Sequence, residues 1–409
     1  MSGGDRTWRD AELPTDERVV RACLLRAVEP GTRAVIDLVA QLGAPEALAA
    51  IVQGRPVGDC DVEGMRTRIT PGSGERDLAA AAEIGARLVI PSDPEWPAAL
   101  DDLGRLGLTS FGVYVRGAGP LPILERSISV VGTRVATDYG TWVAAELSGG
   151  MAERGWAVVS GLAFGIDAAA HRGALATAPP GAAAADSGAA VTVAVLACGI
   201  DAVYPKAHRG LLRRILEAGT VITEQPPGAA PHRIRFLVRN RLIAALSGGT
   251  LVVEAAARSG ARTTARYAGA LGRPVMAVPG PITATTSVGC HQLLRDDPAV
   301  GLVTCVDDII EMAGSIGDLA PRPQGVVTDR DSLPALHRKV LDAVPVQAAR
   351  PVERIALTAG VSPHRTAATL AQLALGDYVE QVGPGWRLSI AQRDRRRASG
   401  QEALDLDWW

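Results

Sequence analysis

Short apolar runs of strand length alternate with amphipathic helical stretches through the middle of the chain. The predicted strands cover residues 87–90, 112–116, 127–131, 157–160, 191–197, 220–224, 250–253, 275–278 and 301–305. The predicted helices between them cover residues 139–154, 166–176, 207–218, 242–246 and 263–271. Because buried strands that alternate with helices form a parallel sheet covered on both faces, the pattern predicts an α/β, doubly wound, mostly parallel sheet.

Helical patterns flank this alternation on both sides. Residues 16–54 are rich in Ala and Leu and turn at Glu29-Pro30-Gly31, which predicts a small helical module. Near the other end, three helices and a terminal hairpin are typical of a winged helix. We therefore expect a helical (SAM-like) module at 1–75, a core at 76–313 with a low-complexity insertion at 177–190, a linker at 314–332, a winged-helix domain at 333–390 and a tail at 391–409.

Charge is distributed unevenly along the chain. The formal net charge is −2, yet the segment from Pro231 to Arg273 holds eight arginines and a single acid, Glu254. A local charge that opposes the global charge is the electrostatic footprint of a polyanion partner. The segment therefore predicts a site for nucleic acid or a phosphate ligand, with a solvated helical face as the alternative. Because the chain has only two lysines, Lys206 and Lys339, we expect guanidinium groups to make most phosphate contacts.

Other features exclude several classes of protein. The apolar runs are too short to cross a membrane, and the first ten residues lack the basic and apolar regions of a secretory signal. Five widely spaced cysteines offer neither a disulfide framework nor a CxxC metal pair. We therefore expect a cytoplasmic protein without a membrane span, bound metal or cofactor.

Candidate ligand contacts follow the predicted strands, because ligands of open α/β sheets bind at the carboxyl ends of the strands. After the strand at 127–131, Gly132 permits a tight turn, Thr133 can cap a helix or bind an anion, and Arg134 adds a charged fork. The next strand ends in the glycine-containing stretch 160–167. This stretch does not match the GxGxxG dinucleotide pattern, which argues against an NAD-dependent oxidoreductase. His171, which follows it, is either catalytic or a packing residue.

The order and spacing of several blocks resemble the DNA-processing protein A (DprA, or Smf) family. These blocks are VVGTR (130–134), SGLAFGIDAAAH (160–171), CGIDAVYP (198–205), EQPPG (224–228), RNRLIAALS (239–247), LVVEAAARSGARTTARYA (251–268) and GRPVMAVPG (272–280). The resemblance implies an extended Rossmann-like core that binds single-stranded DNA in a basic pocket without catalytic turnover. It also implies a homodimer that protects incoming single strands and loads RecA recombinase during natural transformation and recombination.

The same resemblance implies a set of DNA-contacting residues: Gly132, Thr133, Arg134, Phe236, Arg239, Asn240, Arg241 and Arg262. Arginines hold phosphates, and an aromatic side chain beside them can stack on a splayed base. Phe236 has arginines on both sides, which favours exposure over a place in the core.

Glu254 and the winged-helix region each have two interpretations. Ser247-Gly248-Gly249-Thr250 and the glycine-rich loops are faintly similar to nucleotide phosphoribohydrolases, for which Glu254 is the obvious candidate acid. The alternative interpretation is that Glu254 forms an ion pair with Arg258 or Arg262. In the winged-helix region the charges balance, which favours a protein-contact or accessory role over reading of duplex DNA.

Overall fold

The computed structural model describes residues 12–177, 190–314 and 333–393. The chain divides into two compact units, Met1–Pro321 and Arg322–Trp409. The predicted insertion at 177–190, linker at 314–332 and tail at 391–409 lie outside the described residues, apart from their outermost positions. Within the described ranges, no helix is long and apolar enough to cross a membrane.

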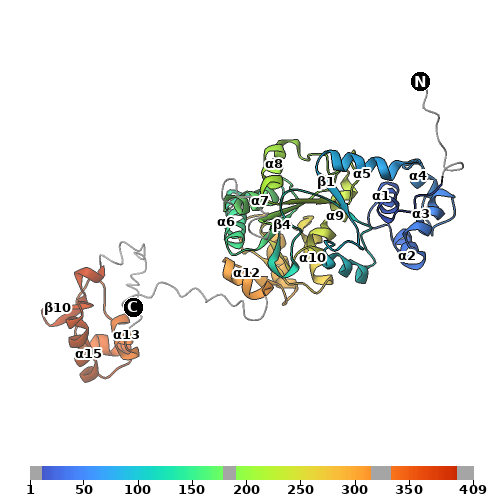
Figure 1. The fold of residues 1–409 in the computed structure, drawn as a ribbon. Coiled ribbons are helices and arrows are strands. Elements are labelled where there is room, and N and C mark those ends of the chain that lie inside the picture. Colours follow the sequence, from blue (N-terminus) through green and yellow to red (C-terminus); the bar gives the residue numbers. More distant parts are fainter. Residues whose placement is uncertain (1–11, 178–189, 315–332, 394–409) are drawn as a thin grey trace. The chain divides into compact units, whose positions relative to one another are not determined.

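The larger unit is built on one sheet (Figure 1), which has nine strands in the described part of the chain. The strands are β1 Ala86–Val89, β2 Val113–Arg116, β3 Ser127–Val131, β4 Ala157–Ser160, β5 Thr192–Val195, β6 Thr220–Thr223, β7 Gly249–Val252, β8 Val275–Ala277 and β9 Gly301–Leu302. Their order is β1-β2-β6-β5-β4-β3-β7-β8-β9; β1 and β2 are antiparallel additions, and the strands from β6 to β9 are parallel. This confirms the predicted doubly wound, mostly parallel α/β sheet.

Helices cover both faces and one end of this sheet. The described helices of the larger unit are α1 Glu17–Ala27, α2 Arg33–Leu42, α3 Ala44–Val52, α4 Val62–Thr67, α5 Ser73–Glu83, α6 Asp138–Glu153, α7 Ile166–Ala176, α8 Arg209–Ala218, α9 Arg233–Ala245, α10 Ala261–Ala270, α11 Val288–Asp296 and α12 Val306–Ala313, with short 3-10 helices η1 Ala98–Leu106, η2 Leu124–Arg126 and η3 Lys206–His208. Successive strand residues point to opposite faces. Val130 therefore packs with α6, α7 and α12, whereas Val131 packs with α9, α10 and α11. Each fully buried apolar side chain of this kind contributes about 1.5–3 kcal/mol.

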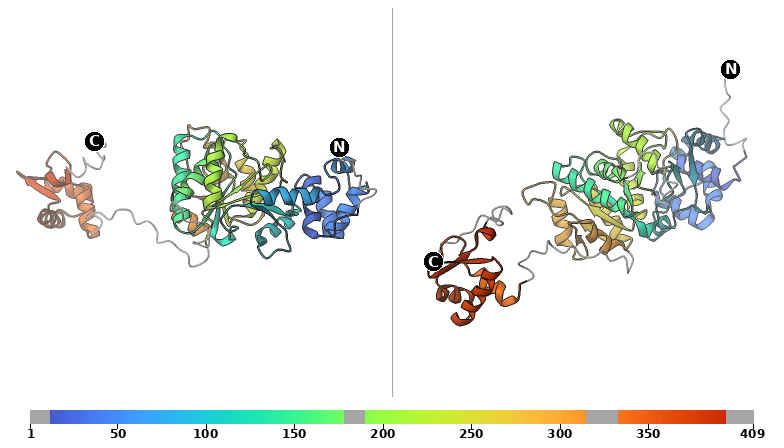
Figure 2. Two further views of the ribbon diagram at one scale, coloured as in Figure 1. Left: turned by 45° about the horizontal axis from the view of Figure 1, so that its top comes forward. Right: turned by 60° about the vertical axis from the view of Figure 1, so that its left-hand side comes forward.

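The amino-terminal helices share a hydrophobic cluster with the sheet. Leu24 and Ile51 pack in one cluster with Leu88, Tyr114 and Leu196, which come from β1, β2 and the end of β5. The helix α5 runs through the predicted boundary at residue 75 and packs on both α1 and β1. The views in Figure 2 show α1 to α5 against one end of the sheet. As a result, these helices and the sheet form one compact unit.

The strand predicted at 301–305 is shorter than expected. β9 ends at Leu302, and the chain then turns into α12. The Asp308 carboxylate accepts hydrogen bonds from the amides of Thr304 (2.7 Å) and Cys305 (3.1 Å). This capping of α12 takes up backbone donors that a longer strand would use in the sheet.

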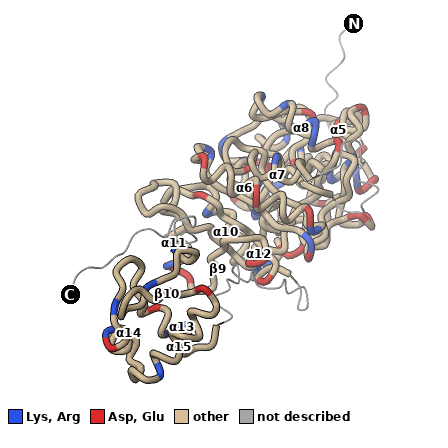
Figure 3. The backbone as a smooth tube through the Cα atoms, turned by 90° about the vertical axis from the view of Figure 1, so that its left-hand side faces the viewer, with Lys and Arg blue, Asp and Glu red and all other residues tan. Residues whose placement is uncertain are grey.

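The smaller unit contains α13 Ala335–Asp342, α14 Val352–Ala359 and α15 Pro363–Leu375, followed by the antiparallel hairpin β10 Val379–Val382 and β11 Gly385–Leu388. Its core is formed by Val340, Ile355, Leu370 and Val379 with their neighbours. Acidic and basic residues are interspersed along its backbone (Figure 3). Arg387 and Glu380, for example, face each other across the hairpin at 2.6 Å.

Candidate nucleic-acid interface

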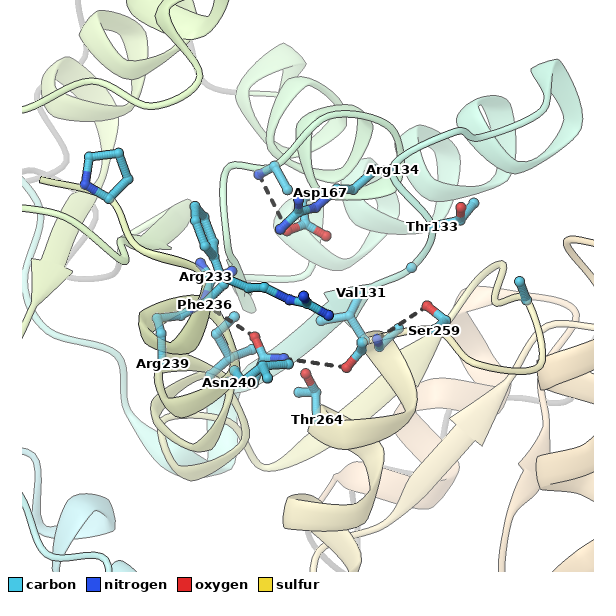
Figure 4. A pocket seen from close by; sticks show the side chains of 18 of the residues that line it. Val131, Thr133, Arg134, Asp167, Arg233, Phe236, Arg239, Asn240, Ser259 and Thr264 are labelled. Carbon is cyan, nitrogen blue, oxygen red and sulfur yellow. Dashed lines mark hydrogen bonds between the residues drawn. The ribbon is translucent and has the colours of Figure 1, made fainter. Parts of the chain in front are cut away.

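A cavity opens where the direction of strand order reverses. From β3 the chain builds β4, β5 and β6 on one side, and then crosses to β7 on the other side of β3. Such switch points are where open α/β sheets bind ligands. A cavity of about 620 Å³ lies here (Figure 4). Its lining comprises Val131, Gly132, Thr133, Arg134, Ala163, Asp167, Tyr204, Pro231, Arg233, Phe236, Leu237, Arg239, Asn240, Ile243, Ala256, Ser259, Gly260, Ala261 and Thr264.

The turn after β3 is fixed by its neighbours. A Cβ atom on Gly132 would lie only 2.4 Å from Ile166 Cγ1, so the close approach of α7 requires glycine here. The Thr133 amide donates to the Glu254 carbonyl (2.7 Å), and the Ile166 amide donates to the Thr133 carbonyl (3.2 Å). Gly132 and Thr133 therefore hold the turn in place, and the exposed Arg134 side chain is presented at the cavity.

Arg134 lies against an aromatic pair. Its guanidinium carbon is 5.0 Å from the centroid of the Phe236 ring, which is cation–π geometry. The rings of Phe236 and Tyr204 are 5.4 Å apart at a tilt of 53°. Phe236 is half-buried at the cavity wall and Tyr204 is 43% exposed. Phe236 is thus neither a core residue nor a freely exposed one.

Arg239 lies deeper, at the base of the cavity. It is only 6% exposed, and its Nη1 donates to the carbonyls of Gly161 (2.8 Å) and Val195. A Cβ atom on Gly161 would lie 2.3 Å from this guanidinium, so glycine makes room for it. Burial lowers the pKa of Arg239 to about 10, partly offset by the nearby Asp167 carboxylate. Arg239 therefore ties α9 to the ends of β4 and β5 while it contributes positive charge to the cavity.

Asp167 and Asn240 complete the inner wall. Burial raises the pKa of the Asp167 carboxyl, and the positive charges of Arg239 and Arg134 act against that rise. Figure 4 shows Asp167 and Arg134 on one side of the cavity, and Arg233, Phe236 and Asn240 on the α9 side. The Asn240 Nδ2 donates to the Gly260 carbonyl (3.3 Å), which joins α9 to the start of α10.

The expectation that Arg241 contacts DNA is wrong. Its side chain is fully buried, and it donates from Nη1 and Nη2 to the two Glu224 oxygens at 2.6 and 2.7 Å. Its Nε donates to the Leu108 carbonyl (3.1 Å). Residues two apart on an α-helix point about 200° apart. With Arg239 facing the cavity, Arg241 therefore faces the interior.

Two other arginines of the basic segment are also paired with acids of the same chain. Arg235 donates to both carboxylate oxygens of Glu29 at 2.9 and 2.7 Å. Arg273 is buried and donates to Asp102 (3.1 Å) and to backbone carbonyls. The acids that balance this segment thus come from elsewhere in the chain, so counting charge within the segment overstates what is free to bind an anion.

Arg262 lies beside the main cavity rather than in it. Its Nη1 donates to the Ala257 carbonyl (2.6 Å) and to Gln292 Oε1 (2.7 Å). It lines a second cavity of about 570 Å³, on the far side of Ser259.

Among the cavity residues that the predicted site did not include, Arg233 and Tyr204 offer a cation and an aromatic ring. Arg233 is exposed in the first turn of α9, and Tyr204 follows β5. Arg233 stands three positions before Phe236, and residues at that spacing share one face of a helix. This three-residue spacing is the feature of the sequence from which Arg233 could have been predicted.

Glu254 and His171, the candidate catalytic residues, have structural partners. Glu254 pairs with neither Arg258 nor Arg262; its carboxylate accepts from the Thr137 amide (3.0 Å) and hydroxyl (2.6 Å) and from the Thr286 hydroxyl (3.1 Å). It therefore anchors the start of α6. His171 is fully buried, with its Nδ1 2.7 Å from the Thr192 hydroxyl. This burial favours the packing interpretation of His171.

His171 should make the protein sensitive to acid. Burial lowers its pKa from the ordinary 6.5 to about 3. Between these values the unfolded chain binds a proton there and the folded chain does not, so stability falls as pH falls through this window. His171→Gln should flatten the dependence of unfolding free energy on pH by up to about 1.4 kcal/mol per pH unit. Denaturant melts from pH 7 to pH 4 measure it, with the exposed His232→Gln as control; equal slopes in both variants would contradict the assignment.

The fold and the cavity together define a Rossmann-like protein with a basic, aromatic-lined pocket at its switch point. Residues 87–314 match the family described as DNA recombination-mediator protein A, and the chain belongs to this family. This confirms the resemblance stated above.

Individual relatives extend the match beyond that core. A Mycobacterium tuberculosis relative that carries the DNA-processing name DprA is 40% identical over 398 residues, 93% of this chain and 97% of the relative. Protein Smf of Escherichia coli is 33% identical over 319 residues, 75% of this chain and 79% of the relative. The X-ray structure of DNA processing protein A from Streptococcus pneumoniae superposes with a TM-score of 0.58 at 25% identity, covering 75% of this chain and all of that one.

Proposed function

We propose that the cavity binds single-stranded DNA. The observation that carries this proposal is the stack of Arg134 on Phe236 beside Tyr204, with Arg233 on the adjacent turn of α9. Guanidinium groups form charge-assisted bonds to phosphates, and aromatic faces accept bases whatever their sequence. The pocket thus places a phosphate-binding guanidinium and a base-stacking ring side by side, 5.0 Å apart.

Two further features support this ligand. The amino terminus of α10 meets the cavity at Gly260 and Ala261, and helix amino termini favour phosphate. In a duplex the bases are stacked on one another, so they cannot lie on Phe236 or Tyr204 without being unpaired. Splayed single strands can.

The finer parts of the function follow from family membership. We propose that the protein protects incoming single strands in the cytoplasm and loads RecA recombinase onto them during natural transformation and recombination. The family description as a recombination mediator supports this role. We also propose a homodimer; in the described sheet β9 is an edge strand and Leu302 is 55% exposed there, which leaves a surface for a second copy.

We further propose that the site binds without turnover. A phosphoribohydrolase would need a free acid, and the Glu254 carboxylate already accepts hydrogen bonds from the Thr137 and Thr286 hydroxyls. Asp167, the carboxylate among the described residues that line the cavity, faces the charge of Arg239. For the smaller unit we propose a protein-contact or accessory role, because Arg365 and His364 alone supply basic character to the exposed first turn of α15.

Salt dependence and strand preference test the proposed function. With Arg134 and Arg233 as the free cations of the pocket, log K for an oligothymidine of about 5 nucleotides should fall with log salt at a slope of about −1.4. A duplex should bind about 5- to 150-fold more weakly, because it forgoes base stacking. Fluorescence anisotropy titrations at several salt concentrations measure both. A slope near zero, or equal affinity for single strand and duplex, contradicts the proposal.

A further inference from the structure

Exposed aromatic and basic side chains continue past the cavity along the carboxyl edge of the sheet. In spatial order the strands run β7, β3, β4 and β5, and the cavity is lined by residues from the segments that follow all four. The loop after β4 carries Phe164, which is 49% exposed and follows the cavity residue Ala163. The segment after β5 carries Tyr204, and then Lys206 and Arg209, both exposed.

Phe164 is held as a fixed platform. Its ring lies edge-on to His208, with the ring centroids 4.8 Å apart. His208 is itself buried, and its Nδ1 is 2.9 Å from the Leu162 carbonyl. Leu162 has a positive φ of 57° while its side chain is fully buried. A left-handed conformation is costly for leucine and persists where the surroundings over-determine it. The loop is thus fixed by packing at its base, yet it exposes a large aromatic ring at its tip.

The charge along this edge is positive. Between Cys198 and Gly210 the single acid is Asp201, and its carboxylate accepts from the Gly228 amide (2.9 Å). Lys206 belongs to η3 and Arg209 begins α8, immediately after His208. Two cations therefore stand within two positions of His208 in the chain, and His208 contacts the Phe164 ring. Interleaved cations and exposed aromatics are the features with which proteins bind single strands irrespective of sequence.

We infer that a single strand leaving the cavity past Tyr204 continues over Phe164 and along the start of α8. One base stacks on Phe164, and Lys206 and Arg209 hold the flanking phosphates. This inference rests on the proposed function, because the cavity supplies the first nucleotides of the strand. Tyr204 makes the path continuous, since it both lines the cavity and directly precedes the Pro205-Lys206 segment.

Oligothymidines of about 5 and about 15 nucleotides separate the cavity from this outer track, since they fall near the two ends of known single-strand site sizes. Phe164→Ala should weaken binding of the long oligomer about 5- to 150-fold and leave the short one unchanged. Lys206→Gln/Arg209→Gln should flatten the salt slope of the long oligomer by about 1.4 and leave that of the short one unchanged. Phe164→Tyr should bind like the parent, because it keeps the ring.

Matched controls exclude effects of net charge and of aromatic loss elsewhere. Trp142→Ala removes an aromatic side chain of α6 that is 63% exposed. Arg33→Gln/Arg105→Gln removes two cations that are 64% and 72% exposed on α2 and η1. Both controls should bind the long oligomer like the parent. Thermal melting should give midpoints close to that of the parent for every variant, since each changed side chain is exposed and the ion pairs of Arg33 and Arg105 lie at the surface.

The outcomes distinguish this inference from the proposed function. If Phe164→Ala binds the long oligomer like the parent, the outer track is refuted, while binding of the short oligomer and its loss in Arg134→Ala would still support the cavity. If the short oligomer fails to bind and the long one depends on Phe164, the cavity assignment fails instead. If Phe164→Ala keeps full DNA affinity but loses binding of a recombinase, this surface serves a protein partner and the inference is overturned.

Discussion

Arg241→Ala should lower the free energy of unfolding by about 3–5 kcal/mol, because it leaves the Glu224 carboxylate buried without its partner. The two side chains are 1% and 4% exposed, so water cannot replace the lost hydrogen bonds. The pair also joins α9 to the end of β6, which keeps the cavity wall in register with the sheet. Denaturant unfolding followed by circular dichroism measures the change.

Two controls make this prediction specific. Arg241→Met/Glu224→Leu removes both charges together and should recover much of the lost stability, as buried pairs replaced by apolar residues often do. Arg33→Ala breaks the exposed pair with Asp37 and should cost under about 1 kcal/mol. If Arg241→Ala is as stable as the parent and binds DNA more weakly, the original assignment of Arg241 as a DNA contact is correct.

Single-strand binding should be weaker in three variants, Arg134→Ala, Arg233→Ala and Phe236→Ala. The two arginine variants lose a phosphate contact, and the phenylalanine variant loses base stacking. Each arginine variant should lose about 1.5–3 kcal/mol, the range for a hydrogen bond to a charged group, and should flatten the salt slope by about 0.7. Phe236→Ala should lose about 1–3 kcal/mol without changing that slope, because stacking releases no counterions. Titrations at several salt concentrations distinguish the loss of a phosphate contact from the loss of stacking.

Arg105→Ala provides the matched control for charge, since its side chain is 72% exposed and lies on η1 rather than at the cavity. Phe236→Leu provides a second control, because it preserves apolar bulk without a flat ring. A Phe236→Ala variant that melts far below the parent yet keeps its affinity would assign Phe236 to packing.

The elements of the sheet were largely predictable because each has a strong local signal. The helix expected at 166–176 has those bounds in the structure. Its start is marked by Gly165, whose φ of 74° few other residues adopt. By contrast, nothing in the sequence near β1 or β2 indicates that β2 pairs antiparallel with β6 and that β1 pairs antiparallel with β2. That arrangement depends on contacts between distant segments.

The candidate site shows the same limit. Arg134 and Phe236, both predicted as ligand contacts, line the cavity, and they lie just after a strand and in the first turn of a helix. Arg241 stands two residues after a cavity residue, and only the helix geometry and the distant Glu224 reveal that it points inward. Arg235 is paired with Glu29, 206 positions earlier in the chain. Local charge thus identifies a basic segment, but tertiary contacts decide which of its charges are free.

One titration tests the central claim, that the cavity at the switch point binds single-stranded DNA. Labelled oligothymidine of about 5 nucleotides, within the range of known single-strand sites, is titrated with the parent and with Arg134→Ala/Arg233→Ala, each confirmed to be folded. The parent should bind with a salt slope of about −1.4, and the double variant should lose both most of its affinity and that slope. If the double variant binds like the parent, with the same slope, the cavity is not the DNA site.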